Sequence, residues 1–262
     1  MANCETEEER ARTSELIRPI LRGRDIKRYG YEWANLYLIA TFPACRYDID
    51  NYPAVKDYLV SFAEQNLRES GNNWVADLYL EDYCKQKLAQ TGKFIEIKGK
   101  RIYIGNTAEK ARKKTSNKWF ETQDSISYWE DFYKPKIMYP NMTKFMPFYY
   151  DEKQFFQNDK SFMITGEHTA FLTAFLNSSI FKFCFIDNFP ELLGGTRELR
   201  KIFFDKIPVL QVSDEVNNTF IPIIESIQME YTYEKAKEVD SMIFDLYNLT
   251  LEERQVIGFV EF

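Results

Sequence analysis

The stretch TAFLTAFLNSSIFKFCFI, from Thr169 to Ile186, decides the fold class of this chain. Apolar side chains occupy most of its helical circumference, and good helix formers are frequent in it. A helix that is apolar on nearly every side must be covered by other elements. We therefore predict a buried central helix over residues 169–186, preceded and followed by the elements that cover it.

Short runs of β-type residues lie around this helix. Ile95 and Ile97, then Ile102 and Ile104, flank Lys98-Gly99-Lys100, which predicts a hairpin with a basic turn. Further strands are predicted at 36–40 (buried), 134–139, 146–150 and 162–165, and residues 202–210 are expected to end in another β-like segment.

Helical patterns occupy both ends of the chain. A frayed helix is expected within residues 5–16, and others from Pro53 and over 74–90. Apolar residues recur at helical spacing over 220–227 and 236–247, and Thr250 with Glu253 forms a capping box. We expect an α+β fold of mixed, mainly antiparallel small sheets with packed helices, followed by a C-terminal α-helical segment. The predicted division is a domain at 16–212 and an acidic helical segment at 213–262.

Composition excludes several classes of protein. The chain has 262 residues, of which 45% are hydrophobic and 16% aromatic, enough for a sizeable core and too much for global disorder. No run approaches the ~18 apolar residues of a membrane span. The residues after Met1 are acidic, whereas a signal peptide begins with basic and then apolar residues. We expect a cytoplasmic protein without membrane contact.

Cysteine and histidine are too sparse for two common kinds of site. Cys4, Cys45, Cys84 and Cys184 show no C-x-x-C spacing, and His168 is the single histidine. A structural zinc site needs four clustered ligands, and a Ser-His-Asp triad needs a dedicated imidazole. We expect reduced cysteines, no metal, and His168 at a helix N-terminus.

Charge is distributed unevenly along the chain. The net charge is -6, but residues 213–262 alone hold 11 acidic and 3 basic residues, so the rest of the chain is slightly basic. Basic residues concentrate in two clusters, at 18–28 and at 93–118. Such local clusters can bind phosphate even in an acidic protein, although a charge run is often only a solvated loop.

The motifs of several enzyme classes are missing from the sequence. It has no Gly-x-Gly-x-x-Gly, no Gly-rich loop ending in Gly-Lys-Ser/Thr, and no Pro-Pro-Tyr/Phe of an amino-methyltransferase. Glu96-Ile97-Lys98 matches half of a metal-nuclease signature, with Asp77 or Asp82 as the second carboxylate. That short pattern is common by chance, so a cryptic nuclease remains a minor alternative.

An ordered set of motifs resembles one known family. Pro19 to Ile26 with Tyr29, Lys134 to Ile137 after Trp119 and Trp129, and Phe175 to Ser179 open the set. Ile207-Pro208, Asp240, Leu246-Tyr247, Leu249-Thr250 and Glu253 close it. Together they resemble the TaqI-like C-terminal specificity domain over about residues 16–258.

The resemblance implies a function and a set of partners. Such domains are target-recognition modules of type II restriction-modification enzymes and related phage-defence adenine methyltransferases. They read a short double-stranded DNA sequence and position an N-terminal methyltransferase region of the same enzyme. The chain would then be no enzyme by itself, and S-adenosylmethionine and Mg²⁺ would belong only to the missing catalytic regions. The segment 213–262 would be a spacer or docking surface.

Cations are the candidate DNA contacts, because Lys and Arg bind phosphates and read guanine edges. We expect no catalytic and no metal-binding residue. The candidate DNA-binding residues are Arg22, Arg24, Lys27, Arg28, Arg112, Lys113, Lys114, Lys118, Lys134, Lys136, Arg197 and Arg200. The competing interpretation is a protein–protein interaction module that makes no direct DNA readout.

Overall fold

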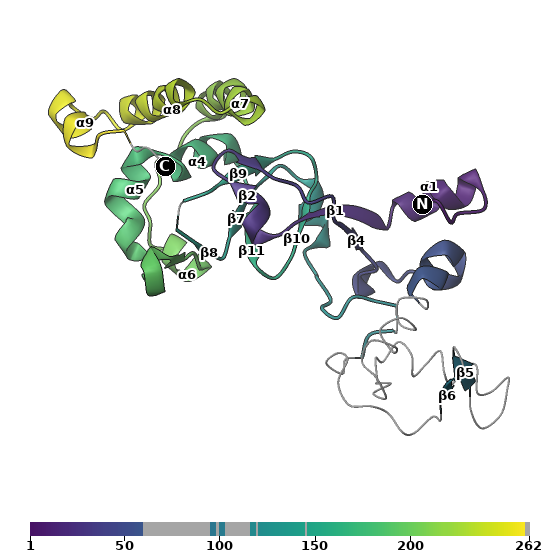
Figure 1. Ribbon diagram of the computed structural model, residues 1–262. Helices are drawn as coiled ribbons and strands as arrows, with labels where there is room; N and C mark the ends of the chain where they lie inside the picture. Colours follow the sequence, from purple (N-terminus) through teal and green to yellow (C-terminus); the bar gives the residue numbers. More distant parts are fainter. Residues whose placement is uncertain (60–94, 98–99, 103–115, 119, 145, 260–262) are drawn as a thin grey trace. The chain divides into compact units, whose positions relative to one another are not determined.

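The computed structural model describes residues 1–59, 95–97, 100–102, 116–118, 120–144 and 146–259. They form the predicted α+β fold of helices and small, mostly antiparallel sheets (Figure 1). Their contacts define two compact units. Unit 1 comprises Met1–Arg18 and Leu38–Trp129, and unit 2 comprises Pro19–Tyr37 and Glu130–Phe262. Residues 213–262 fall inside unit 2, so the expected boundary at residue 212 does not divide these units.

Unit 1 begins with a capped helix. Helix α1, Glu7–Ser14, starts after Thr6, whose hydroxyl accepts the N–H of Glu9 at 3.1 Å. The buried Glu9 carboxylate accepts the N–H of Ala54 at 2.9 Å, and this bond is the main cause of its lowered pKa. The core of this unit consists of Leu16, Ile49, Tyr52, Val55 and Phe120.

The remaining elements of unit 1 are short. They are the 3-10 turns η2, Pro43–Cys45, and η3, Ile49–Asn51, a helical segment over 53–59, and strands β5, Ile95–Ile97, and β6, Lys100–Ile102. The last two pair antiparallel with Ile95 opposite Ile102, which confirms the predicted hairpin. Its turn residues Lys98 and Gly99, and the helix expected over 74–90, lie outside the described residues.

Strands β1, Ile17–Leu21, and β4, Tyr37–Ile39, lie where the chain passes between the units. A buried strand was expected at 36–40. The strand forms, but Leu36 and Tyr37 are 41% and 58% exposed. Only Ala40, just after its end, is buried.

The central sheet of unit 2 has three antiparallel strands in the order β11-β7-β9. They are β7, Lys136–Pro140, β9, Tyr149–Asp151, and β11, Ser161–Ile164, close to three predicted strands. Every residue of β7 is buried because it is the middle strand. Smaller pairs surround it: β2, Ile26–Lys27, with β3, Gly30–Tyr31; β8, Met142–Thr143, with β12, Arg197–Glu198; and β10, Phe156–Gln157, parallel to β1.

The predicted central helix is two helices. α4, Thr169–Leu176, and α5, Ser179–Phe185, are separated by Asn177 and Ser178 and differ in direction by 64°. The break has a polar cause. The Ser178 hydroxyl caps α5 by accepting the N–H of Phe181 at 3.2 Å, while the Asn177 amide exchanges two hydrogen bonds with the backbone of Phe148.

The apolar α4–α5 pair belongs to the core of unit 2. Within the described part of the chain, no single helix is long and apolar enough to cross a membrane. The bent α4–α5 pair meets that test only by length and composition, and most of its α4 residues are buried in the core of unit 2.

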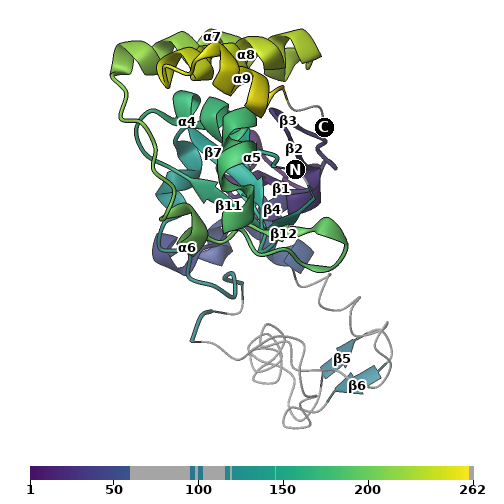
Figure 2. The ribbon, with the colours of Figure 1, turned by 90° about the vertical axis from the view of Figure 1, so that its left-hand side faces the viewer.

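Three C-terminal helices complete unit 2. They are α7, Asp214–Met229, α8, Tyr233–Leu246, and α9, Leu251–Ile257, the last with the predicted capping box. Figure 2 shows them as a layer over α4 and α5. Buried apolar residues such as Phe220 and Ile243 join the main core, and the buried Asp240 carboxylate accepts the N–H of Ser179 at 2.7 Å at the start of α5. This segment therefore packs as an integral part of unit 2.

One predicted strand is wrong. Residues 202–210 begin inside a short helix, α6, Lys201–Phe204, and continue without regular structure. Phe203, Phe204, Ile207 and Val209 pack against the main core. These apolar residues serve core packing, and their spacing was misread as the alternation of a strand.

Candidate nucleic-acid interface

A half-open pocket of about 610 Å³ lies in unit 2 between two segments that are far apart in sequence. One wall comes from η1, Gly23–Asp25, and β2, and the other from the ends of β7, β8 and β11. Five basic residues line it, and no carboxylate is among its lining residues. The basic residues are Arg24, Lys27, Arg28, Lys144 and Lys160.

The two walls approach each other closely at Gly23. A Cβ atom at this position would lie 2.3 Å from the carbonyl oxygen of Lys160, closer than real Cβ atoms come. Glycine is therefore needed here for close backbone approach. The same Lys160 carbonyl accepts the N–H of Asn141 at 2.9 Å, which ties the ends of β7 and β11 together.

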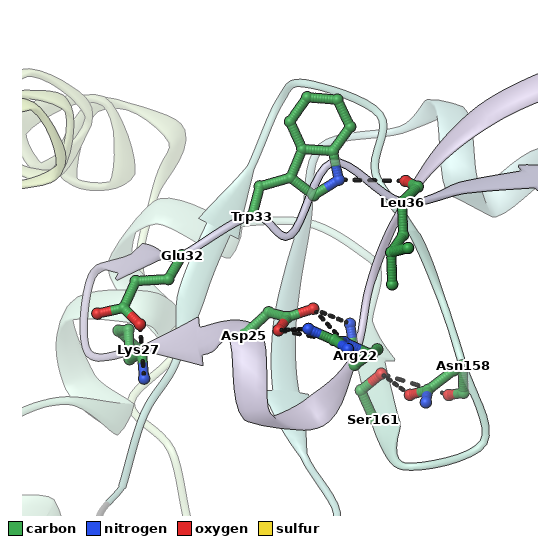
Figure 3. Close-up of polar contacts among 8 residues, drawn as sticks. All are labelled: Arg22, Asp25, Lys27, Glu32, Trp33, Leu36, Asn158 and Ser161. Carbon is green, nitrogen blue, oxygen red and sulfur yellow. Dashed lines mark hydrogen bonds and ion pairs between the residues drawn. The ribbon is translucent and has the colours of Figure 1, made fainter.

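The turn at Gly23 separates two neighbouring arginines. The Arg22 guanidinium lies 2.8–2.9 Å from both oxygens of the buried Asp25 carboxylate (Figure 3). Burial pushes the Asp25 pKa upward, but the hydrogen bonds from Arg22 outweigh it, so the pKa is lowered. Arg24 is exposed on the pocket and makes no hydrogen bond or ion pair with any described residue. The predicted pair thus divides into one structural and one surface arginine.

The other pocket cations differ in how strongly they are held. Lys27 lies 3.3 Å from Glu32 in an exposed pair, which Figure 3 also shows, and Lys160 lies 2.7 Å from Asp159 in another. Exposed pairs contribute about 0–1 kcal/mol, so a phosphate can replace the carboxylate. Lys144 is exposed and has no ion-pair partner among the described residues.

The Arg28 guanidinium is held by hydrogen bonds to other parts of unit 2. It donates to the Asn177 carbonyl oxygen at 2.7 Å and to the Tyr231 hydroxyl at 2.8 Å. Arg28 is also one of the residues that line the pocket. Arg28 therefore links the pocket to the helices behind it.

Sequence reasoning missed Lys144, Lys160 and Asn141. The side-chain oxygen of Asn141 is buried and has no hydrogen-bond partner among the described residues. The antiparallel register of β7 and β11, with Pro140 opposite Ser161, brings Lys160 beside Asn141, and the close approach of Gly23 to the Lys160 carbonyl brings both to the first basic cluster. Sequence reasoning could not place these residues at the pocket, because residue spacing alone does not give the register of paired strands.

Two further predicted cations, Lys134 and Lys136, differ in their exposure to solvent. Lys134 is 61% exposed and lies 2.6 Å from Asp131, its partner in an i,i+3 pair. Lys136 is fully buried, 2.5 Å from the equally buried Asp151, and donates to the Phe132 carbonyl oxygen. Desolvation lowers the pKa of Lys136 and raises that of Asp151. This corrects the expectation that Lys136 lines a groove, because its charge is neutralised inside the sheet.

Arg197 and Arg200 lie on and after β12. Arg197 is only 17% exposed in its side chain and donates to the Phe189 carbonyl oxygen at 2.9 Å. It also contacts Asp187 and Glu191 at 3.2 and 3.1 Å. Arg200 is 59% exposed and lies 2.7 Å from Glu198. Arg197 therefore fastens its own loop, and Arg200 remains at the surface.

The remaining candidates belong to unit 1. Lys118 is exposed, with its ammonium 5.6 Å from the centre of the Phe120 ring. Arg112, Lys113 and Lys114 lie outside the described residues. So do Asp77, Asp82 and Lys98 of the nuclease alternative, and only the backbone of Glu96 is described.

Metal-binding groups and thiols were the other chemistry that the sequence raised, and the described residues hold few of either. Where the structure describes the chain, no group of three or more His, Cys, Asp or Glu side chains could hold a metal ion. Cys4, Cys45 and Cys184 are free thiols, and Cys184 is exposed. His168 stands at the N-cap of α4, as predicted, with its Nε2 3.0 Å from Asp214.

The chemistry of the pocket is that of anion binding. Exposed Lys and Arg heads supply charge, and its walls are fixed by backbone hydrogen bonds. A comparison with curated proteins found no match. Residues 91–209 match the family model of the TaqI-like C-terminal specificity domain, which confirms the resemblance that the sequence motifs indicated.

Proposed function

We propose that this chain is the double-stranded DNA recognition module of a restriction-modification, or related defence, methyltransferase. The match over residues 91–209 carries the proposal, since the matching family is one of specificity domains. The second wall of the basic pocket, from Pro140 to Lys160, lies within the matched segment. The pocket then binds the phosphate backbone beside the target sequence.

The module acts without catalysis of its own. It positions a separate adenine methyltransferase or nuclease region, which supplies S-adenosylmethionine and Mg²⁺ chemistry. The described residues support this division of labour because the pocket concentrates cations rather than acid–base pairs. Its place of action is the cytoplasm, where the host DNA lies.

Fluorescence anisotropy with a labelled duplex of randomised central sequence tests the proposal. Each phosphate-binding cation adds about 0.9 to the slope of log affinity against log salt. We expect salt-dependent binding by the wild type, and a slope lower by about 2 in the double variant Arg24→Glu/Lys144→Glu. Lys206→Glu is the matched control, because Lys206 is exposed in the same unit and lies outside the pocket.

Two results would contradict the proposal. The first is a wild-type slope that both the pocket variant and the control leave unchanged. The second is absence of binding at about 50 mM salt, where phosphate contacts are strongest, both for this chain and for the full-length enzyme.

Docking of the methyltransferase region is a second role, favoured by exposed apolar side chains on the C-terminal helices. Met229, Leu251 and Val256 are 83%, 75% and 70% exposed. Deleting residues 213–262 cannot test docking, because it would remove the core residues Phe220 and Ile243 and uncover Phe171 of α4, which packs against Phe220. The substitutions Leu251→Asp and Val256→Asp leave that core intact, and we expect them to weaken capture of the methyltransferase region without changing the salt slope of DNA binding.

A further inference from the structure

One surface feature of unit 2 is unexplained by phosphate binding: a fully exposed leucine at the tip of a loop. Leu193 is 99% exposed and lies in η6, Leu193–Gly195. Gly194 and Gly195 follow with φ of 76° and 77°, a backbone conformation that favours glycine. These glycines allow the tight return that leaves Leu193 projecting from the surface.

The base of this loop is firmly held. The N–H of Leu192 donates to the Thr196 carbonyl oxygen at 2.6 Å, and the backbones of Glu191 and Arg197 form an isolated antiparallel β-bridge. The Arg197 guanidinium adds hydrogen bonds to Asp187, Glu191 and two backbone carbonyl oxygens. A leucine on such a base is presented with little entropy left to lose on binding.

The loop is joined directly to the wall of the basic pocket. Arg197 pairs with Thr143 across β12 and β8, and the Leu199 N–H donates to the Asn141 carbonyl oxygen at 2.7 Å. Thr143 and Asn141 both line the pocket. Since neighbouring strands lie about 4.8 Å apart, the main chain at Glu191 is about 10 Å from that of Thr143.

The acidic side chains near the loop are paired with arginines, which reduces their repulsion of an anionic partner. Asp187 and Glu191 lie against Arg197, and Glu198 against Arg200. Only the apolar tip projects without a paired charge. Apolar side chains used in this way enter the step between two base pairs and kink the duplex, while adjacent cations hold the phosphates.

We propose that Leu193 is an apolar wedge that enters a base step of the DNA held by the basic pocket. The inference rests on the proposed function and adds a positioning residue to it. Contact with a protein partner through the same tip is the alternative that the test distinguishes.

The test uses a duplex that the wild-type chain selects from a randomised pool. That duplex carries 2-aminopurine at successive positions to report unstacking, and a fluorophore pair at its ends to report bending. We expect Leu193→Ala to abolish the 2-aminopurine increase and the bend, and to weaken binding by about tenfold, in line with the loss of a buried leucine. The salt slope should stay unchanged, because Leu193 contacts no phosphate.

Two matched variants sharpen the measurement. Leu193→Met keeps a long apolar side chain and should restore both signals. Ile202→Ala removes another exposed apolar side chain of unit 2, in α6, and should change neither.

The outcomes separate the inference from the proposed function. If Leu193→Ala equals the wild type, or if the wild type binds a straight and stacked duplex, the wedge is overturned while DNA recognition stands. If neither the wild-type chain nor the full-length enzyme binds a duplex, DNA recognition and the wedge both fail, and loss of methyltransferase capture in Leu193→Ala would then mark the tip as a protein contact.

Discussion

The end of the β7–β9 pair where β7 starts and the pocket at the other end of β7 place cations in opposite settings. In the pair, Lys136 and Asp151 are both fully buried and neutralise each other. In the pocket, Arg24 and Lys144 are exposed and form no ion pair with any described residue. The difference teaches that a cation in a basic stretch is available to contact a phosphate only where the fold leaves its head group exposed.

Breaking the buried pair gives the largest expected effect. Lys136→Met leaves the Asp151 carboxylate buried without its cation, and we expect a loss of about 3–5 kcal/mol in the free energy of unfolding. Lys134→Met, two residues earlier, removes an exposed cation and should cost at most about 1 kcal/mol. Chemical denaturation of both variants measures the difference, and equal losses would contradict the burial argument.

A methyl group at Gly23 should come next. Gly23→Ala places a carbon against the Lys160 carbonyl, and the resulting overpacking should cost about 3 kcal/mol. Because the pocket walls must separate, DNA affinity should fall as well. Gly30→Ala is the control, since a Cβ there meets nothing within 4 Å. Thermal unfolding and anisotropy on the same two variants would show whether stability and affinity change together.

The two arginines of one turn offer a sharper comparison. Arg22→Gln removes the partner of the buried Asp25, and we expect it to cost about 1–2 kcal/mol of stability with little change in salt slope. Arg24→Gln should leave stability unchanged and lower the salt slope by about 1. If both variants changed the same quantity, the division into structural and surface arginine would be wrong.

Lowering the pH should have the smallest effect on stability, and that effect can be assigned to a single carboxylate. The folded-state pKa of Asp25 lies below its ordinary value of 3.8, so its ionised form stabilises the fold above that pH. This contribution disappears as the pH falls from about 4 toward the folded-state pKa. Asp25→Asn should therefore show a weaker loss of stability below pH 4 than the wild type, as denaturant midpoints across pH 2–6 would reveal. An unchanged acid profile would remove Asp25 from the acid response.

The local patterns that the sequence predicted well are those set by neighbouring residues. The β5–β6 hairpin, β7, β11, the helices α7 and α8 and the capping box of α9 all follow from periodicity and turn chemistry. The break between α4 and α5 did not, because it depends on the contact of Asn177 with the distant Phe148.

The candidate site was predicted only in part for a similar reason. Arg24 and Lys27 stand in a conspicuous basic cluster, so composition found them. Lys144 and Lys160 are isolated in sequence and join the site only through strand register. Lys136 looked equivalent to Lys134, since the opposing Asp151 that neutralises it becomes a neighbour only in the folded sheet.

The pocket walls also have a consequence for how the chain folds. Gly23 and Lys160 are more than a hundred residues apart in sequence, and the intervening chain includes most of unit 1. Closing so long a loop is slow compared with forming a hairpin or a helix. During refolding the chain should therefore regain the circular-dichroism signal of its helices before it can bind a phosphate. On the ribosome, the first basic cluster is synthesised well before the residues that form the opposite wall of the pocket.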